Sequence, residues 1–212
     1  MLLEATETVL GYFGFDSTLF GPTTITTDVY TEEVSDSDIP DWATDNIFPL
    51  VYLLPFFNIT FFRQNNEHYI AFEHRTNLTR GVFIPYSKID HNQIYVYVTI
   101  DGNRVEVLFD SGSGGFDILT TRTARRIGIN RYPLKHVESR KPNIYDIPID
   151  FGHGLVVNMD VISSDVYPAS IIAVQELYKK GYGVTYKSNG VDIFSNNINA
   201  VLRGDYYYGA DL

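Results

Sequence analysis

The stretch from Val105 to Leu119 constrains this chain more than any other. An apolar run, Val105 to Phe109, leads into Asp110 and then into a turn of small residues, Ser111 to Gly115, before apolar residues resume. Glycine and serine let backbone N–H groups approach a carboxylate, and apolar flanks limit the access of water. The stretch therefore predicts an acid held in a loop that is rich in backbone donors. The same residues also favour ordinary surface turns, so the local string alone leaves both interpretations open.

Regular elements frame this loop on both sides. Before it, alternating runs over 94–100 and 104–109, joined by Asp101-Gly102, predict a β-hairpin with a tight turn. After it, residues 120–128 predict a short helix with a threonine cap, an inward apolar face and a closing glycine. Residues 144–163 predict a second hairpin. The abundance of Tyr, Phe and β-branched residues also favours a mainly β fold.

Two motifs in this framework resemble a known family. Residues 108–113, Leu-Phe-Asp-Ser-Gly-Ser, resemble the Asp-Thr/Ser-Gly-Ala/Ser signature of aspartic proteases, with an apolar pair before the acid. Ile171, Ile172 and Ala173 resemble the two apolar residues and one small residue that pack beneath the active-site loop in retropepsin-like proteases. The chain around them, 167–193, is similar to copia-type retrotransposon proteases. The interval of 61 residues, 171 minus 110, suits a single-lobed retropepsin.

The resemblance covers about residues 92–195 and implies a retropepsin-like acid-protease fold, mainly β, with one or two short helices. It implies that Asp110 is catalytic and that Ser111, Gly112 and Ser113 support the active-site loop. Ser111 would hydrogen-bond two such loops together, and Gly112 would admit water and substrate. Ile171, Ile172 and Ala173 would pack under the loop.

The chain contains one Asp-Ser-Gly string, whereas the chemistry of aspartic proteases uses two carboxylates. The resemblance therefore implies a homodimer in which each copy provides Asp110. One carboxylate would act as general base on a water molecule, and the other, protonated, would polarise the scissile carbonyl. The expected substrate is a peptide or a polyprotein, and no metal or organic cofactor is implied.

Two other classes of protein stay open. Residues 132–143, the expected flap, are rich in charge where family members have glycine, and Ala173 replaces the usual glycine. Both departures are compatible with a catalytically inert module for dimerisation or peptide binding. The chain is also compatible with a structural β protein of a virus or retroelement, in which the Asp110 loop is an ordinary turn.

Charge divides the chain unevenly. Residues 1–62 contain ten acids and no Lys or Arg, while the remainder contains sixteen residues of each sign. The sequence predicts an acidic, partly disordered lead-in over 1–46, a β-rich accessory region over 47–91, the protease-like domain over 92–195 and an extension over 196–212. Within the lead-in, the apolar spacing over 2–13 predicts a short helix. Such acidity argues against binding of nucleic acid or anionic membranes.

Composition narrows the remaining chemistry. The chain has no cysteine, which excludes disulfides, thiolate zinc sites and cysteine nucleophiles. Its five histidines show no spacing typical of metal ligands. Residues 1–7 lack the features of a signal peptide, and no apolar run is long enough for a membrane span. We therefore expect an intracellular protein.

Overall fold

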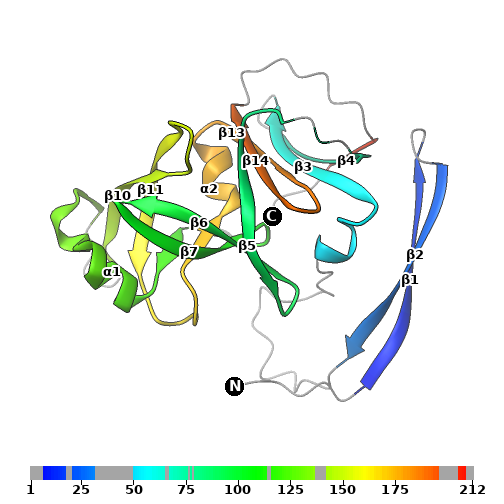
Figure 1. Ribbon diagram of the computed structural model, residues 1–212, viewed down its shortest axis with the longest axis horizontal. Helices are drawn as coiled ribbons and strands as arrows, with labels where there is room; N and C mark the ends of the chain where they lie inside the picture. Colours follow the sequence, from blue (N-terminus) through cyan, green and yellow to red (C-terminus); the bar gives the residue numbers. More distant parts are fainter. Residues whose placement is uncertain are drawn as a thin grey trace.

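Strands make up most of the described chain, which confirms the mainly β fold class (Figure 1). The computed structural model describes residues 7–17, 21–31, 50–64, 67–75, 77, 79–113, 116–136, 142–195 and 205–208. Among these, the α-helices are short: α1 spans Thr121–Ile127 and α2 spans Val174–Lys179. Two 3₁₀ turns, η1 (Leu50–Tyr52) and η2 (Ile129–Arg131), complete the helical content of the described residues.

Thirteen strands belong to one continuous sheet, in the order β15-β4-β3-β13-β14-β5-β6-β7-β12-β8-β11-β10-β9. Their bounds are β3 Phe57–Gln64, β4 Glu67–His74, β5 Val82–Asp90, β6 Gln93–Ile100, β7 Asn103–Asp110, β8 Asp117–Leu119, β9 Leu134–His136, β10 Ile144–Asp150, β11 Val156–Ser163, β12 Ile171–Ala173, β13 Tyr182–Tyr186, β14 Gly190–Ser195 and β15 Asp205–Tyr208. Strands β1 (Glu7–Ser17) and β2 (Gly21–Thr31) form a separate antiparallel pair.

Part of the large sheet curls into a closed circuit. Following the pairings, β6 leads to β7, β12, β8, β11 and β10, and β10 returns to β6 through the pair Asp150–Thr99. Alternate residues of β6 and β7 are buried inside it, in the period-2 pattern of half-buried strands. Closure removes sheet edges, so the strand that ends at Asp110 is paired on both sides.

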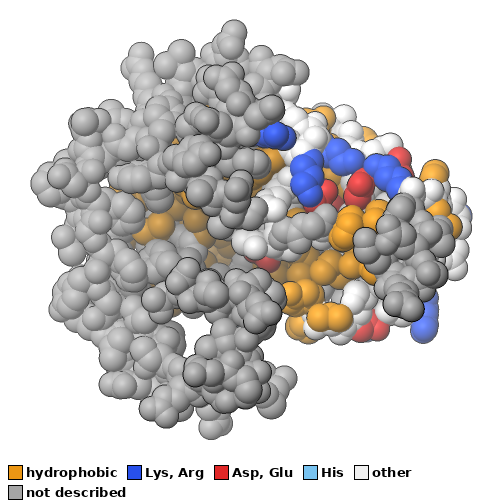
Figure 2. All heavy atoms as spheres, turned by 180° about the vertical axis from the view of Figure 1, so that it is seen from behind, with side chains coloured by type: hydrophobic (Ala, Val, Ile, Leu, Met, Phe, Trp, Pro, Cys, Tyr) orange, Lys and Arg blue, Asp and Glu red, His pale blue; other side chains and the backbone are white. Residues whose placement is uncertain are grey.

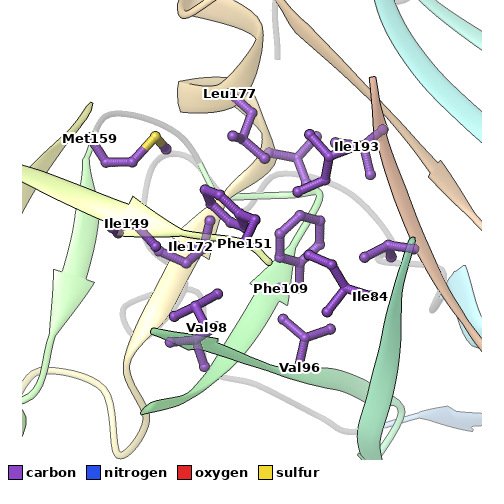
Figure 3. Packing of buried hydrophobic residues seen from close by; sticks show 14 of the residues in the cluster. Ile84, Val96, Val98, Phe109, Ile149, Phe151, Met159, Ile172, Leu177 and Ile193 are labelled. Atoms are coloured by element: carbon purple, nitrogen blue, oxygen red, sulfur yellow. The ribbon is translucent and has the colours of Figure 1, made fainter. Parts of the chain in front are cut away.

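One hydrophobic core connects the barrel to the neighbouring strands. Figure 3 shows Phe109 surrounded by side chains from several parts of the chain, including Ile84 of β5, Ile193 of β14 and Phe151, which follows β10. Phe109 is 2% exposed, so the residue just before Asp110 is anchored in this core. Close packing of Phe109 therefore limits the positions that the backbone of Asp110 can adopt.

The predicted turn and helix are both present. Asp101 and Gly102 have φ angles of 48° and 73°, the left-handed conformations that a primed hairpin turn requires. In α1, the Thr120 side chain accepts a hydrogen bond from the Thr123 backbone N–H. Gly128 ends the helix in the left-handed conformation, with φ 65°. The positions of both elements were therefore predicted correctly from the sequence.

The accessory region is continuous with the protease-like sheet. Strand β3 pairs with β13 and with β4, while β5 lies between β14 and β6 (Figure 1). In the extension, β15 adds a strand to β4. Residues on both sides of position 91 thus share one sheet and one core.

The predicted helix at the start of the chain is wrong where the structure describes it. Residues 7–17 form β1, which pairs along its whole length with β2, from Glu7–Thr31 to Ser17–Gly21. The apolar spacing fitted a helix as well as a strand, and the threonine-rich partner supplied the hydrogen bonds that favour the strand. Residues 1–6 and 32–49 lie outside the described residues.

Candidate active site

Asp110 occupies the last position of β7 and begins the loop predicted to carry the chemistry. Its Oδ1 atom accepts a hydrogen bond of 2.9 Å from the backbone N–H of Gly112. The Asp110 side chain is partly buried, while Gly112 is exposed. The loop thus presents a carboxylate that a backbone donor orients, at a position that solvent or a substrate can reach.

Gly112 has open space around its α-carbon. A Cβ built there would meet the Asp110 Oδ1 atom at 3.6 Å, an ordinary van der Waals contact, and φ is not in the left-handed region. Within the chain, therefore, no steric conflict requires glycine at this position. The role implied by the resemblance, access for water and substrate, concerns the outer side of the loop and stays a prediction.

Strand β12 forms the base of the loop. It runs parallel to β7, with Ile171 opposite Leu108, Ile172 opposite Phe109 and Ala173 opposite Asp110. The three β12 residues are 2%, 0% and 0% exposed. The chain therefore brings the two motifs together in space, with the small residue beside the acid.

A second carboxyl group, Asp117, lies next to this base, and sequence reasoning missed it. Asp117 is completely buried, and its Oδ1 atom accepts a 2.8 Å hydrogen bond from the Ala173 backbone N–H. Its Oδ2 atom has no hydrogen-bond partner among the described residues. Burial raises the pKa of Asp117 well above its ordinary value, and the negative charge of nearby Glu176 acts in the same direction. The sequence signal that could have indicated this residue is an acid within the otherwise apolar run 116–119.

Tyr186, at the end of β13, also lies at the site, and no pattern in the sequence predicted it there. Its hydroxyl donates a 3.1 Å hydrogen bond to the Phe109 carbonyl oxygen, and its ring is fully buried. Ser111 and Ser113 are both partly buried. The predicted contact of Ser111 with a second subunit stays a prediction.

The middle of the expected flap, 137–141, lies outside the described residues. Its described beginning includes Lys135, whose Nζ lies 2.5 Å from Asp160 Oδ1 and 3.0 Å from Asp146 Oδ1. Hydrogen bonding to Asp160 raises the Lys135 pKa above its ordinary value. Figure 2, the view from behind, shows Lys and Arg side chains beside Asp and Glu side chains on the described part of the face that it presents. Lys135 therefore serves as an ion-pair partner between strands.

The described residues can also be compared with the requirements of a metal site and of a membrane-spanning helix. They contain no group of three or more His, Asp or Glu side chains placed to hold a metal ion. None of the helices in the described ranges is long and apolar enough to cross a membrane.

The elements around Asp110 follow the order that the resemblance implies. A hairpin feeds the loop, a capped helix and a second hairpin follow, and a short strand returns beneath the loop before a helix. This connectivity confirms the retropepsin-like arrangement predicted from the sequence.

Nineteen chains of solved structures are similar to this chain, among them the following two. A retropepsin-like aspartic protease from Rickettsia conorii is 12% identical, with a TM-score of 0.40, over 54% of this chain and 90% of that one. The retroviral protease-like domain of Ddi1 from Leishmania major is 21% identical, with a TM-score of 0.34, over 50% of this chain and 97% of that one. No family model and no curated protein matches the sequence.

Proposed function

We propose that the chain is an aspartic endopeptidase whose active site forms when two copies meet and each contributes Asp110. The observation that carries the proposal is the Asp110 carboxylate itself. It is oriented by the Gly112 N–H and stands on a buried strand pair, in a loop that is open to solvent on its other side. A general base needs this combination of fixed geometry and access.

The mechanism follows from placing two such carboxylates side by side. Like charges in close contact cannot both ionise easily, so the pair holds one proton at mildly acidic pH. The ionised member takes a proton from water as the water oxygen bonds to the scissile carbonyl carbon. The protonated member donates its hydrogen to the carbonyl oxygen. The C–N bond then breaks, the nitrogen takes up a proton, and a carboxylic acid and an amine leave.

The experiment replaces Asp110 by Asn in the full chain and digests a peptide library from about pH 4 to 8. Asn is nearly isosteric and its carbonyl oxygen can still accept the Gly112 N–H, but it cannot take a proton from water. We expect cleavage to disappear while sedimentation shows the same dimer and circular dichroism the same fold. Parent activity should fall as pH rises and both carboxylates become charged.

The alternatives predict different results in the same experiment. Cleavage by Asp110→Asn at the parental rate would exclude the aspartic-protease mechanism. An inactive parent that still forms a dimer would instead identify the inert module. An inactive and monomeric parent would identify the structural β protein, in which the Asp110 loop is only a turn.

A further inference from the structure

Tyr186 connects the accessory hairpin to the active-site loop. Its ring lies between Phe61 of β3 and Phe109 of β7, with ring centroids 5.7 Å and 5.9 Å away. The Phe61 pair is edge-on, at 75°, an arrangement that aromatic rings favour. One side chain from β13 thus touches both the accessory region and the residue that precedes Asp110.

The hydroxyl of Tyr186 bonds the backbone directly before the acid. It donates to the carbonyl oxygen of Phe109, the residue that precedes Asp110, at 3.1 Å. Because the phenol is fully buried, this bond satisfies it, and losing the bond is costly. Burial also raises the Tyr186 pKa well above its ordinary value, so the hydroxyl stays a donor throughout the working pH range.

The β3–β4 hairpin fixes the position of Tyr186. In the β3–β13 ladder Ile59 pairs with Tyr186 and Thr60 pairs with Thr185. The Thr60 and Thr185 hydroxyls are 2.8 Å apart, and Thr60 also donates a 2.7 Å bond to Glu73 of β4. Main-chain pairing, a buried hydroxyl contact and ring packing therefore hold the same end of β13.

From this geometry we propose that Tyr186 is a positioning residue for Asp110. The β3–β4 hairpin contributes to the active site because it holds Tyr186 in place. The hairpin fixes the position of the tyrosine, and the tyrosine holds the backbone directly before the acid. The proposal rests on the proposed function for its catalytic consequence, while its structural claim concerns the order of the loop. Small displacements of a catalytic group lower the rate strongly, so loss of the hydroxyl should reduce turnover.

The test compares Tyr186→Phe with Tyr145→Phe in the full chain. Tyr145 is a matched control because its side chain is also buried and its hydroxyl also makes a 3.1 Å bond, to Asn130 Oδ1 in η2. Both variants lose a hydroxyl that makes a 3.1 Å bond, but the Tyr145 hydroxyl contacts Asn130 and, at 3.5 Å, Asn143, and neither residue belongs to the Asp110 loop. We measure the NMR order parameter of the Gly112 N–H, and kcat and KM for the best peptide found in a library digest.

The expected results separate positioning from general stability. Tyr186→Phe should lower the Gly112 order parameter and reduce kcat about 10- to 100-fold with KM nearly unchanged. Tyr145→Phe should leave both the order parameter and kcat within about twofold of the parent, although both variants melt at somewhat lower temperature. Equal behaviour of the two variants would overturn the proposal.

A third variant, Phe61→Leu, tests the hairpin directly and covers the case in which Tyr186→Phe does not fold. It keeps an apolar side chain but removes the ring that packs on Tyr186. We expect lower order at Gly112 and reduced kcat; a lower melting temperature alone would contradict the role of the hairpin. If the parent itself cleaves no peptide, the proposed function fails, and the Gly112 measurement still decides whether Tyr186 positions the loop.

Discussion

Asp110 and Asp117 carry the same carboxyl group in two contrasting environments. Asp110 ends a strand and faces a loop that solvent reaches, where a backbone N–H orients it. Asp117 is completely buried and binds the Ala173 N–H through one oxygen, while its other oxygen has no partner among the described residues. The first environment suits proton exchange with a substrate. The second favours a carboxyl group that keeps its proton and holds β12 against β8.

Asp117 should make the protein less stable as pH rises. Its pKa is raised by burial from 3.8, so the folded chain retains a proton that the unfolded chain loses above that pH. The free energy of unfolding therefore falls as pH increases from about 4 toward the folded-state pKa. Asp117→Asn cannot ionise and accepts the same Ala173 hydrogen bond. Urea unfolding between about pH 4 and 7 should show the variant gaining stability relative to the parent.

Asp165→Asn serves as a control of opposite sign. Hydrogen bonds from the Thr121 side chain and backbone N–H lower the Asp165 pKa, so its contribution to stability is present above the unfolded pKa and is lost on acidification. This variant should lose stability relative to the parent as pH rises. Parallel curves for Asp117→Asn and the parent would contradict the buried, protonated state of Asp117.

At the scale of elements, the short strand β12 joins the two motifs. It is only three residues long, yet it pairs with β7 on one side and with β8 on the other. Ala173 is 0% exposed beside Asp110, so a small side chain suits the position.

Ala173→Leu should overpack this strand and destabilise the fold by ~1–3 kcal/mol. Ala173→Gly, which adds no volume, should cost only about 0.5–1 kcal/mol through backbone entropy. Thermal melting and peptide cleavage check both variants. If Ala173→Leu melts like the parent and retains activity, the packing role assigned to residues 170–177 is wrong.

A buried polar cluster joins the β3–β4 hairpin to the rest of the sheet. Arg80 makes two bonds to Glu73, of 2.6 Å and 2.5 Å, and its backbone N–H lies 3.3 Å from Asp192 Oδ2. The Glu73 side chain is 7% exposed, and the Arg80 guanidinium is the cation that pairs with it.

Arg80→Gln should cost about 2–4 kcal/mol, because it leaves the buried Glu73 carboxylate without its cation while Arg80 itself is a quarter exposed. Glu73→Gln should cost less, since it removes the buried charge and still accepts from Thr60. Denaturant unfolding of both single variants and the double variant measures the coupling. A coupling energy near zero in this cycle would show that the ion pair does not hold the hairpin.

At the scale of the whole molecule, the large sheet crosses the boundary predicted at residue 91. Among the described residues, in contrast, the β1–β2 pair shares no strand pairing with that sheet. The hydrophobic core begins at Leu53 and Leu54, just after η1, and includes residues of β3 and β14. Stability should therefore depend on residues from about position 50 onward and not on the acidic start.

Deleting residues 1–45 should leave the fold and its melting temperature close to those of the parent. Deleting 1–66 should unfold the chain or make it aggregate, because β13 would lose its β3 partner and Phe61 would no longer cover Tyr186. Solubility, circular dichroism and melting check both truncations. An insoluble or unfolded 46–212 chain would show that the lead-in belongs to the core.

The sequence by itself determined the local elements. Alternating apolar residues and Asp101-Gly102 specified the β6–β7 hairpin, and Thr120 and Gly128 specified the ends of α1, because these signals act over a few neighbouring residues. The resemblance placed Asp110 and the 171–173 motif in one site. Tertiary structure decided the rest: β1 paired with β2, β3 paired with β13, Asp117 bonded to Ala173 of β12, and Tyr186 bonded to Phe109. Pairing and burial between distant segments fix such contacts, and no local pattern encodes which segments will meet.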